Sequence, residues 1–138
     1  MLCGEYQHSL DLKGRVNFPA KLRESLGDRL FLVRAPGNRC LLVYSYSGWN
    51  QLQTKLREQP GDIQRFLSSS VFEAEPDKQG RILIPPALRD YAELEREITI
   101  IGVLERAEIW NRDHWNEKLN SVTTDKDKLS KAMDELGF

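Results

Sequence analysis

The chain has 138 residues, of which 40% are hydrophobic and 30% are charged, and its formal net charge is −1 at pH 7. This length suits one compact domain or two very small ones that support each other, and the ordinary apolar content argues against disorder. A net charge near zero excludes a general attraction to nucleic acid, so any such binding needs a local basic surface.

The sequence carries no sign of a membrane or secreted protein. No apolar run approaches the ~20 residues of a spanning helix, and the N-terminal segment lacks the charged and apolar regions of a signal peptide. Cys3 and Cys40 are too few and too far apart for a disulfide framework or a cysteine-based zinc site. We therefore expect a reduced, cytoplasmic protein that does not associate with membranes.

The first predicted elements are two strands joined by a tight hairpin loop. Residues 5–10 can form the first strand, and Asp11 and Gly14 then supply the two residue types that such a loop requires. Val16 and Phe18 alternate with polar residues, which is the period of a half-buried strand.

A short helix and two buried strands are predicted next. Pro19 stops the second strand and can open a helix over residues 20–26, which Gly27 closes. Residues 30–33 and 41–44 are apolar enough to be buried strands. Two helices then lead into the second half of the chain, with Ser47 and Asp62 as their candidate capping residues.

The second half of the chain repeats the first. The run DLKGRVNFP at residues 11–19 returns as DKQGRILIP at residues 77–85, so each residue lies 66 positions after its counterpart. The same offset relates Leu22-Arg23 to Leu88-Arg89, Tyr44 to Trp110, and Trp49-Asn50 to Trp115-Asn116. We interpret the chain as two copies of one small unit, each of which covers the apolar face of the other.

The offset also places the elements of the second copy. Their predicted order is strand, loop, strand, short helix and two strands, over residues 70–76, 77–80, 81–84, 86–92, 97–101 and 107–110. Asp113, the counterpart of Ser47, is the candidate cap of the following helix. Leu129, Met133 and Leu136 have helical spacing in a charged background and predict an amphipathic C-terminal helix.

Each copy places two cations in or beside its hairpin loop. One interpretation is structural, in which the aspartate satisfies turn amides, the glycine supplies a left-handed backbone and the arginine pairs with the aspartate. The other is functional, because long cations at the tip and root of a rigid hairpin can reach phosphates or guanine edges. The residues concerned are Asp11, Lys13, Gly14 and Arg15 in the first copy and Asp77, Lys78, Gly80 and Arg81 in the second.

Other charged and aromatic residues have plainer interpretations. Arg23 and Arg89 are each followed by an acid, Glu24 or Asp90, and local ion pairing is expected for them. Four aromatic residues lie at apolar positions and are expected in the core rather than in a base-stacking platform: Tyr44, Trp49, Trp110 and Trp115.

Nothing in the sequence points to catalysis. His8 and His114 are the only histidines, and neither has a histidine as its counterpart in the other copy. The motifs of serine hydrolases, phosphate-binding loops, zinc proteases and dinucleotide-binding enzymes do not occur, and no closely spaced ligand set suits a metal. We therefore expect no catalytic residue, no metal, no cofactor and no small-molecule substrate.

The repeated residues resemble the MraZ family of transcriptional regulators over nearly the full chain. The matching residues are Gly4, 9–15, Pro19, Leu22-Arg23, 42–44 and Trp49, then Asp77, Gly80-Arg81, Ile84-Pro85, Leu88-Arg89, 108–110 and Trp115. The resemblance implies an α+β fold in which two SpoVT/AbrB-type swapped-hairpin units interleave into a small β-barrel with peripheral helices. The implied units are residues 5–49 and 71–115, with a helical linker at 50–70 and a C-terminal helical tail at 116–138.

The resemblance also implies a function. Such proteins bind double-stranded DNA at repeated promoter elements, form rings of about eight or more subunits, and regulate the division and cell-wall gene cluster that includes their own gene, in association with the nucleoid. The family's loop motif falls on Asp11, Arg15, Asp77 and Arg81, whereas Lys13 and Lys78 are candidates by position and charge. The alternative is a protein-interaction or antitoxin-like module on the same barrel, in which the loops are turns only.

Overall fold

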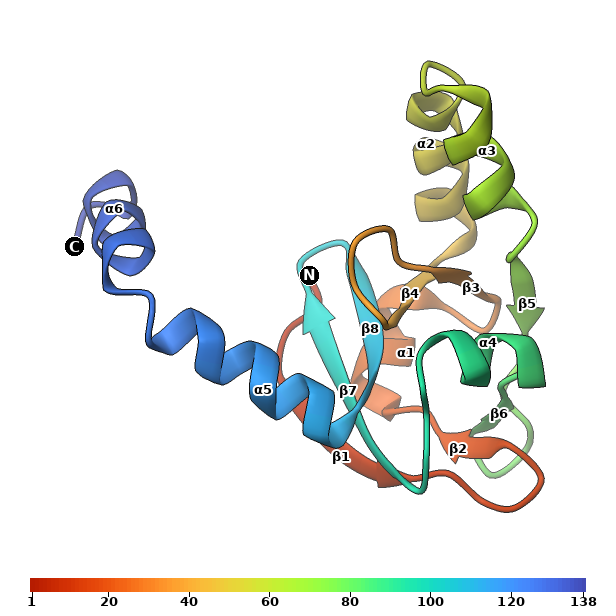
Figure 1. Cartoon of the computed structure of the whole chain (residues 1–138). Helices are drawn as coiled ribbons and strands as arrows, with labels where there is room; N and C mark the ends of the chain where they lie inside the picture. The colour runs from red at the N-terminus through yellow and green to blue at the C-terminus, as the bar shows by residue number, and fades with distance from the viewer.

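The computed structural model describes residues 1–138 and has the predicted α+β architecture (Figure 1). The first half contains β1 (Glu5–Ser9), β2 (Arg15–Asn17), α1 (Ala20–Leu26), β3 (Leu30–Arg34), β4 (Leu41–Tyr44), α2 (Tyr46–Leu56) and α3 (Gly61–Ser68). The second half contains β5 (Phe72–Ala74), β6 (Arg81–Leu83), α4 (Pro86–Tyr91), β7 (Glu97–Val103), β8 (Arg106–Asn111), α5 (Arg112–Thr123) and α6 (Lys126–Leu136). One order of strands and helices therefore occurs twice.

Proline and glycine bound α1 where the sequence predicts. Pro19 has φ −55° and ψ 128°, and its carbonyl oxygen accepts the backbone N–H of Leu22 at 3.1 Å as the helix begins. Gly27 has φ +84° and donates its N–H to the carbonyl of Arg23 at 2.7 Å as the helix ends. Residues with a Cβ avoid this φ, so the glycine ends the helix at low cost.

Strand exchange between the two halves builds the main sheet. Its six antiparallel strands have the order β1-β7-β8-β4-β3-β5. The first strand of each half pairs with the third strand of the other half, β1 with β7 and β5 with β3. The second strands, β2 and β6, pair with each other in a separate ribbon. The two halves are thus interlocked rather than placed side by side.

A local two-fold axis relates the halves. In the ribbon, Val16 faces Ile82, and in the sheet, Leu42 faces Glu108. The members of each facing pair are counterparts at the repeat offset, so the axis passes between them. Equivalent elements of the two copies therefore lie on opposite sides of this axis.

Strand alternation divides the core between the two faces of the sheet. On one face, the ribbon, α1 and α4 cover residues such as Leu30, Leu32, Ile98 and Ile109, all fully buried. The other face is covered largely by helical residues, and its buried members are Phe31, Val33, Ala35, Cys40, Leu42, Trp49, Leu56, Leu67, Ile101 and Trp110. The predicted core positions of Trp49 and Trp110 are therefore confirmed, while Tyr44 and Trp115 are partly buried against the same cluster.

The sheet is not closed into a barrel, and this part of the predicted fold is wrong. Strands β1 and β5 stand at opposite edges and do not pair with each other. The reason lies in the strands that follow them, because β2 and β6 leave the sheet to form the ribbon. The ribbon covers one face of the sheet instead of joining its edges.

Three predicted helix caps are wrong. The cap of α2 is Ser45 rather than Ser47, and its Oγ accepts the N–H of Gly48 at 3.0 Å. The cap of α5 is Asn111 rather than Asp113, and its side chain accepts the N–H of His114 at 3.2 Å. Each of these helices begins within two residues of the end of the preceding strand, so its cap lies two residues before the predicted one. Asp62 lies in the first turn of α3, where it pairs with Arg65 at 2.9 Å.

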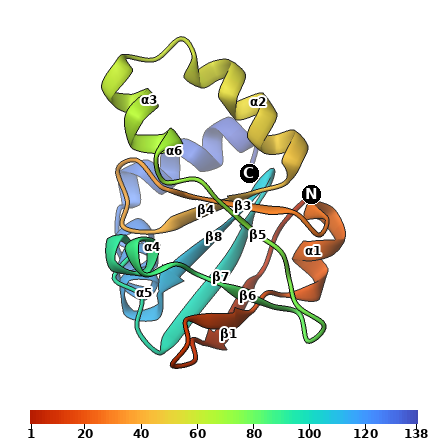
Figure 2. The same cartoon turned by 90° about the vertical axis from the view of Figure 1, so that its right-hand side faces the viewer.

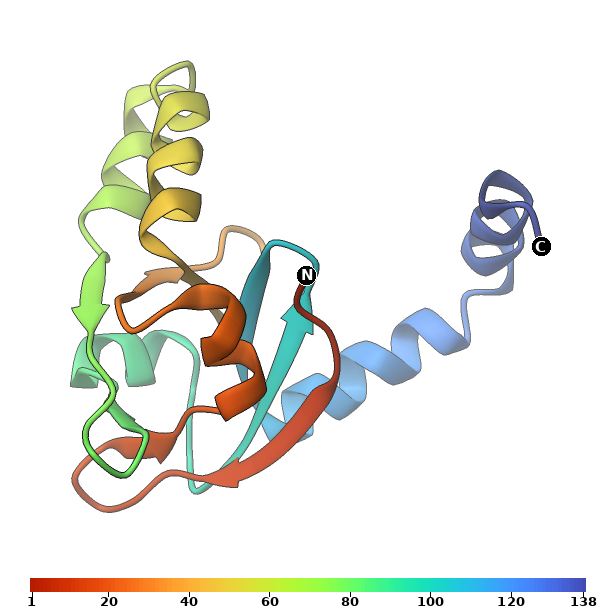
Figure 3. The same cartoon turned by 180° about the vertical axis from the view of Figure 1, so that it is seen from behind.

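The two helical arms differ in how they meet the body. In the first arm, α2–α3, the second helix turns back toward the sheet and buries Leu67. In the second arm, α5–α6, the second helix stands away from the sheet and has no buried residue (Figures 1 and 3). The predicted amphipathic C-terminal helix is present, and its apolar side chains Leu129, Met133 and Leu136 are exposed.

Candidate nucleic-acid interface

The first loop, Asp11–Gly14, is organised by its aspartate. Asp11 Oδ1 accepts the backbone N–H of Lys13 at 2.9 Å and that of Arg15 at 2.8 Å. Gly14 donates its N–H to the Asp11 carbonyl at 3.0 Å and has φ +82°. An aspartate that caps its own turn and a glycine with positive φ are the features that make such a loop rigid.

Arg15 is attached to the root of this loop without being buried. Its Nε donates to Asp11 Oδ2 at 2.9 Å, and its side chain is 31% exposed. The two terminal guanidinium nitrogens make no hydrogen bond within the chain. One edge of the guanidinium is therefore held by the protein, while the other can donate to a ligand.

The second loop, Asp77–Gly80, repeats this arrangement. Asp77 Oδ1 accepts the N–H groups of Gln79 and Arg81, both at 2.9 Å, and Gly80 has φ +80°. Arg81 Nε donates to Asp77 Oδ2 at 3.0 Å, and the Arg81 side chain is 29% exposed. The structural and functional interpretations of the loops are thus compatible, because the ion pair orients each arginine and leaves its outer nitrogens free.

Both aspartates stay ionised over a wide pH range. The backbone N–H of Arg15 is the main cause that lowers the pKa of Asp11, and the N–H of Arg81 does the same for the pKa of Asp77. With the exposed Lys13 or Lys78, each loop carries two cations against one anion. Each loop and its root are therefore net positive in a chain whose overall charge is −1.

The two halves hold each other's loops in place. The Gly14 carbonyl accepts the N–H of Ile84, and the Gly80 carbonyl accepts the N–H of Phe18, both at 2.9 Å. The Arg89 guanidinium lies so close to Gly14 that an added Cβ would be 2.8 Å from Arg89 Cζ. Each loop is therefore supported by the other copy.

Two arginines that were expected in local ion pairs contact the loops instead. Arg23 and Arg89 form no salt bridge, and each packs on the loop glycine of the opposite copy. Arg89 Nε donates to the Ile84 carbonyl at 2.9 Å, and a Cβ on Gly80 would be 3.1 Å from Arg23 Nη2. The sequence does carry a sign of this role, because the Leu-Arg pair recurs in both copies. The acid that follows each arginine made a local ion pair the simpler interpretation.

Both loops project from the same end of the molecule. They lie at the bottom of Figures 1 and 2, at the two ends of the short ribbon and opposite the α2–α3 arm. The ribbon register brings Arg15 opposite Leu83 and Arg81 opposite Asn17. The structure thus gathers the predicted cations Lys13, Arg15, Lys78 and Arg81 at one end.

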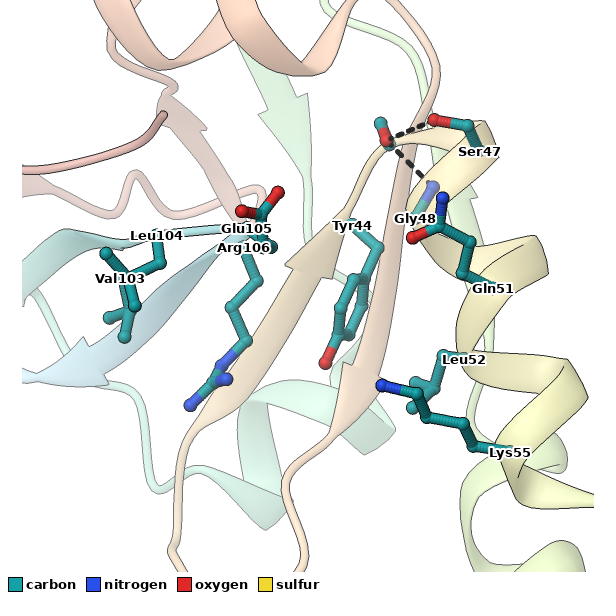
Figure 4. A pocket seen from close by; sticks show the side chains of 11 residues that line it. Tyr44, Ser47, Gly48, Gln51, Leu52, Lys55, Val103, Leu104, Glu105 and Arg106 are labelled. Atoms are coloured by element: carbon teal, nitrogen blue, oxygen red, sulfur yellow. Dashed lines mark hydrogen bonds between the residues drawn. The ribbon is translucent and has the colours of Figure 1, made fainter. Parts of the chain in front are cut away.

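A separate hollow lies at the other end, between α2 and the β7–β8 turn (Figure 4). Its volume is about 390 Å³, and Tyr44, Lys55 and Arg106 contribute polar groups to it. Arg106 is bound by Glu108 at 2.8 Å, and burial raises the pKa of Tyr44. No predicted site residue lines this hollow.

No group of three or more histidine, cysteine, aspartate or glutamate side chains is placed to hold a metal ion. None of the helices is both long and apolar enough to cross a membrane.

Fold and loops define a protein made of two interlocked copies of one strand–helix unit, with a cationic Asp-x-x-x-Arg hairpin in each. The chain belongs to the MraZ family. The family model described as "MraZ protein, putative antitoxin-like" matches residues 1–64 and 68–135.

Relatives of similar length support this membership. The chain is 43% identical over 144 aligned positions to "Transcriptional regulator MraZ" of Caldicellulosiruptor saccharolyticus, 42% to that of Thermoanaerobacter pseudethanolicus and 43% to that of Alkaliphilus metalliredigens. Each alignment covers 100% of both chains. The solution structure of PHS018 from Pyrococcus horikoshii aligns with 79% of this chain and 88% of its own at 20% identity, with a TM-score of 0.33 that supports no conclusion.

Proposed function

We propose that this protein is a DNA-binding transcriptional regulator that contacts duplex DNA with its two loops. The observation that carries the proposal is the pair of matched loops at one end, each with an arginine whose outer nitrogens are free. The names of the relatives, which are transcriptional regulators, support the same function. The proposed contact residues are Lys13, Arg15, Lys78 and Arg81.

The geometry indicates how these contacts would form. Each aspartate fixes one edge of its arginine, so the other edge meets a phosphate or a guanine with little loss of side-chain entropy. The lysines, which are exposed and flexible, are suited to phosphates. Binding should weaken with salt by about 0.9 in log K per log salt for each phosphate neutralised.

Four cations per chain give only modest affinity, so we propose that several chains bind together. A ring of about eight or more subunits would present many loops to repeated promoter elements, and linked contacts raise apparent affinity by orders of magnitude. The proposed targets are the protein's own promoter and the division and cell-wall gene cluster, in association with the nucleoid. Acidic residues on other surfaces then have little effect on binding.

A protein-interaction or antitoxin-like role is the second candidate. The specific observation in its favour is α6, which exposes an apolar stripe of Leu129, Met133 and Leu136. The family description also contains the words antitoxin-like. In this role the loops would be turns, and partner capture would not depend on DNA.

A nuclease footprint upstream of the protein's own gene tests the proposal. The purified full chain should protect short elements that recur at a regular spacing. A pull-down from cell extract, with and without nuclease, separates the two candidates. Partners lost on nuclease treatment support regulation, whereas partners retained together with a blank footprint support the protein-interaction role.

A further inference from the structure

The two loops have one backbone geometry but different side chains at the tip. Leu12 and Lys13 in the first loop correspond to Lys78 and Gln79 in the second. Each tip therefore carries one lysine, and the two loops have the same charge. Their difference lies in a leucine on one tip, an amide on the other, and the position of the cation.

Leu12 has no role in the fold. Its relative exposure is 104%, so its side chain packs against nothing in the chain. The loop hydrogen bonds come from Asp11 and from the backbone, and the second loop adopts the same conformation with Lys78 at this position. Neither packing nor turn formation therefore calls for a leucine. Single exposed apolar side chains are common on proteins, but this one lies at the tip of a cationic hairpin.

The chemistry of the proposed ligand indicates what an apolar tip can recognise. In the major groove, hydrogen-bonding groups line the base edges, and the apolar exception is the C5-methyl group of thymine. Lys13 follows Leu12 directly and Arg15 lies at the root of the same loop, and both would hold backbone phosphates. Leu12 is fully exposed at the tip, beyond the arginine at the root, and is the apolar part of the loop that can enter the groove.

We infer that Leu12 makes the first loop a reader of thymine through apolar contact with the C5-methyl group. The second loop, which has Lys78 at this position, lacks that contact. The two loops would then be attracted to DNA equally by their charge but would recognise different bases. This inference rests on the proposed DNA-binding function and adds the base that one loop selects.

The test removes the methyl group from the DNA and the leucine from the protein. The probe is a duplex of about 40 base pairs from upstream of the protein's own gene, prepared with thymine or with deoxyuridine throughout. Wild-type protein should bind the thymine duplex more tightly, by about three- to fourfold for each contact. Leu12→Ala should bind both duplexes alike, at the wild-type level for deoxyuridine.

Two further variants make the test specific. Lys78→Ala, at the matching position, should weaken binding to both duplexes equally and keep the thymine preference. Leu12→Lys combined with Lys13→Gln gives the first loop the tip of the second without changing its charge. This variant should lose the thymine preference while its salt dependence stays at the wild-type slope.

The outcomes separate this inference from the proposed function. If Leu12→Ala keeps the full thymine preference, the inference is wrong although DNA binding stands. The same holds if wild-type protein binds both duplexes equally. If wild-type protein binds neither duplex, the proposed function and the inference both fail.

Discussion

The two loops share one geometry, whereas the two helical arms do not. In each loop an aspartate accepts two backbone N–H groups and the Nε of the arginine four residues later. In the arms, Leu67 of α3 is 6% exposed, but its counterpart Met133 of α6 is 52% exposed. Geometry is thus shared in the interlocked loops and differs in the second helices of the arms, of which only α3 buries a residue against the body.

A single anchoring residue accounts for much of the difference between the arms. Phe66 of α3 packs against Tyr91 with ring centroids 5.9 Å apart, and the Arg34 guanidinium lies 4.6 Å from its ring. Arg34 also donates to the Phe66 carbonyl at 2.7 Å. The counterpart of Phe66 is Ala132, which has no ring to pack against an aromatic side chain or a guanidinium, and the counterpart of Arg34 is Ile100, which cannot donate to the carbonyl. The second arm therefore lacks the contact that holds the first against the sheet.

The largest expected effect comes from filling the space beside a loop glycine. Gly14→Val should lower the free energy of unfolding by about 2–3 kcal/mol, because a β-branched residue is strained at φ +82° and its Cβ would meet Arg89. Gly80→Val, with Arg23 further away, should cost less. Denaturant unfolding measures both changes.

Gly37 provides the matched control for this series. It has φ +84° but no atom within 4 Å of an added Cβ, so Gly37→Val carries the backbone strain without the contact. The expected cost is about 1–2 kcal/mol. Equal losses at all three glycines would show that the arginines do not support the loops.

The next effect removes the anchor of the first arm. Phe66→Ala should lower the free energy of unfolding by about 2 kcal/mol, since a half-buried ring and its contacts are lost. Hydrogen exchange should rise in α3 and leave the loops unchanged. Ile63→Ala on the exposed side of the same helix should cost roughly 0.5 kcal/mol or less. An unchanged α3 in the Phe66 variant would contradict the explanation given for the arms.

Acid should weaken both loops alike, and this is the smallest expected effect. The folded pKa values of Asp11 and Asp77 lie below the ordinary 3.8, so each contributes stability that is complete above that pH and is lost as pH falls toward the folded pKa. Urea unfolding between pH 5 and about pH 2.5 should show a shallower acid slope in Asp11→Asn and in Asp77→Asn, by similar amounts. A change in only one variant would mean that the loops are not equivalent.

Local signals predicted the elements well. Proline, glycine and alternating apolar residues placed α1 at its observed bounds and put both loops at the correct residues. The sequence did not determine how the halves meet. Strand exchange leaves the sheet open because β2 pairs with β6, and no local pattern states which strands become neighbours.

The candidate site was predicted only in part, for the same reason. The aspartate, glycine and arginine of each loop interact within five residues, so their arrangement follows from local turn chemistry. The contacts of Arg23 with Gly80 and of Arg89 with Gly14 join residues of opposite copies. Glu24 and Asp90 follow these two arginines directly and therefore suggested local ion pairs. A contact between segments that lie far apart in the chain leaves no such local sign.

The most direct test of the account is DNA binding by the variant that carries both Arg15→Ala and Arg81→Ala. We expect an intact fold and affinity for the own-promoter duplex at least tenfold lower, or about 1.4 kcal/mol. The control, Arg57→Ala with Arg65→Ala on the α2–α3 arm, removes the same charge and should bind within about twofold of wild type. Wild-type affinity in the loop variant, or an equal loss in the control, would contradict the claim that the paired hairpins contact DNA.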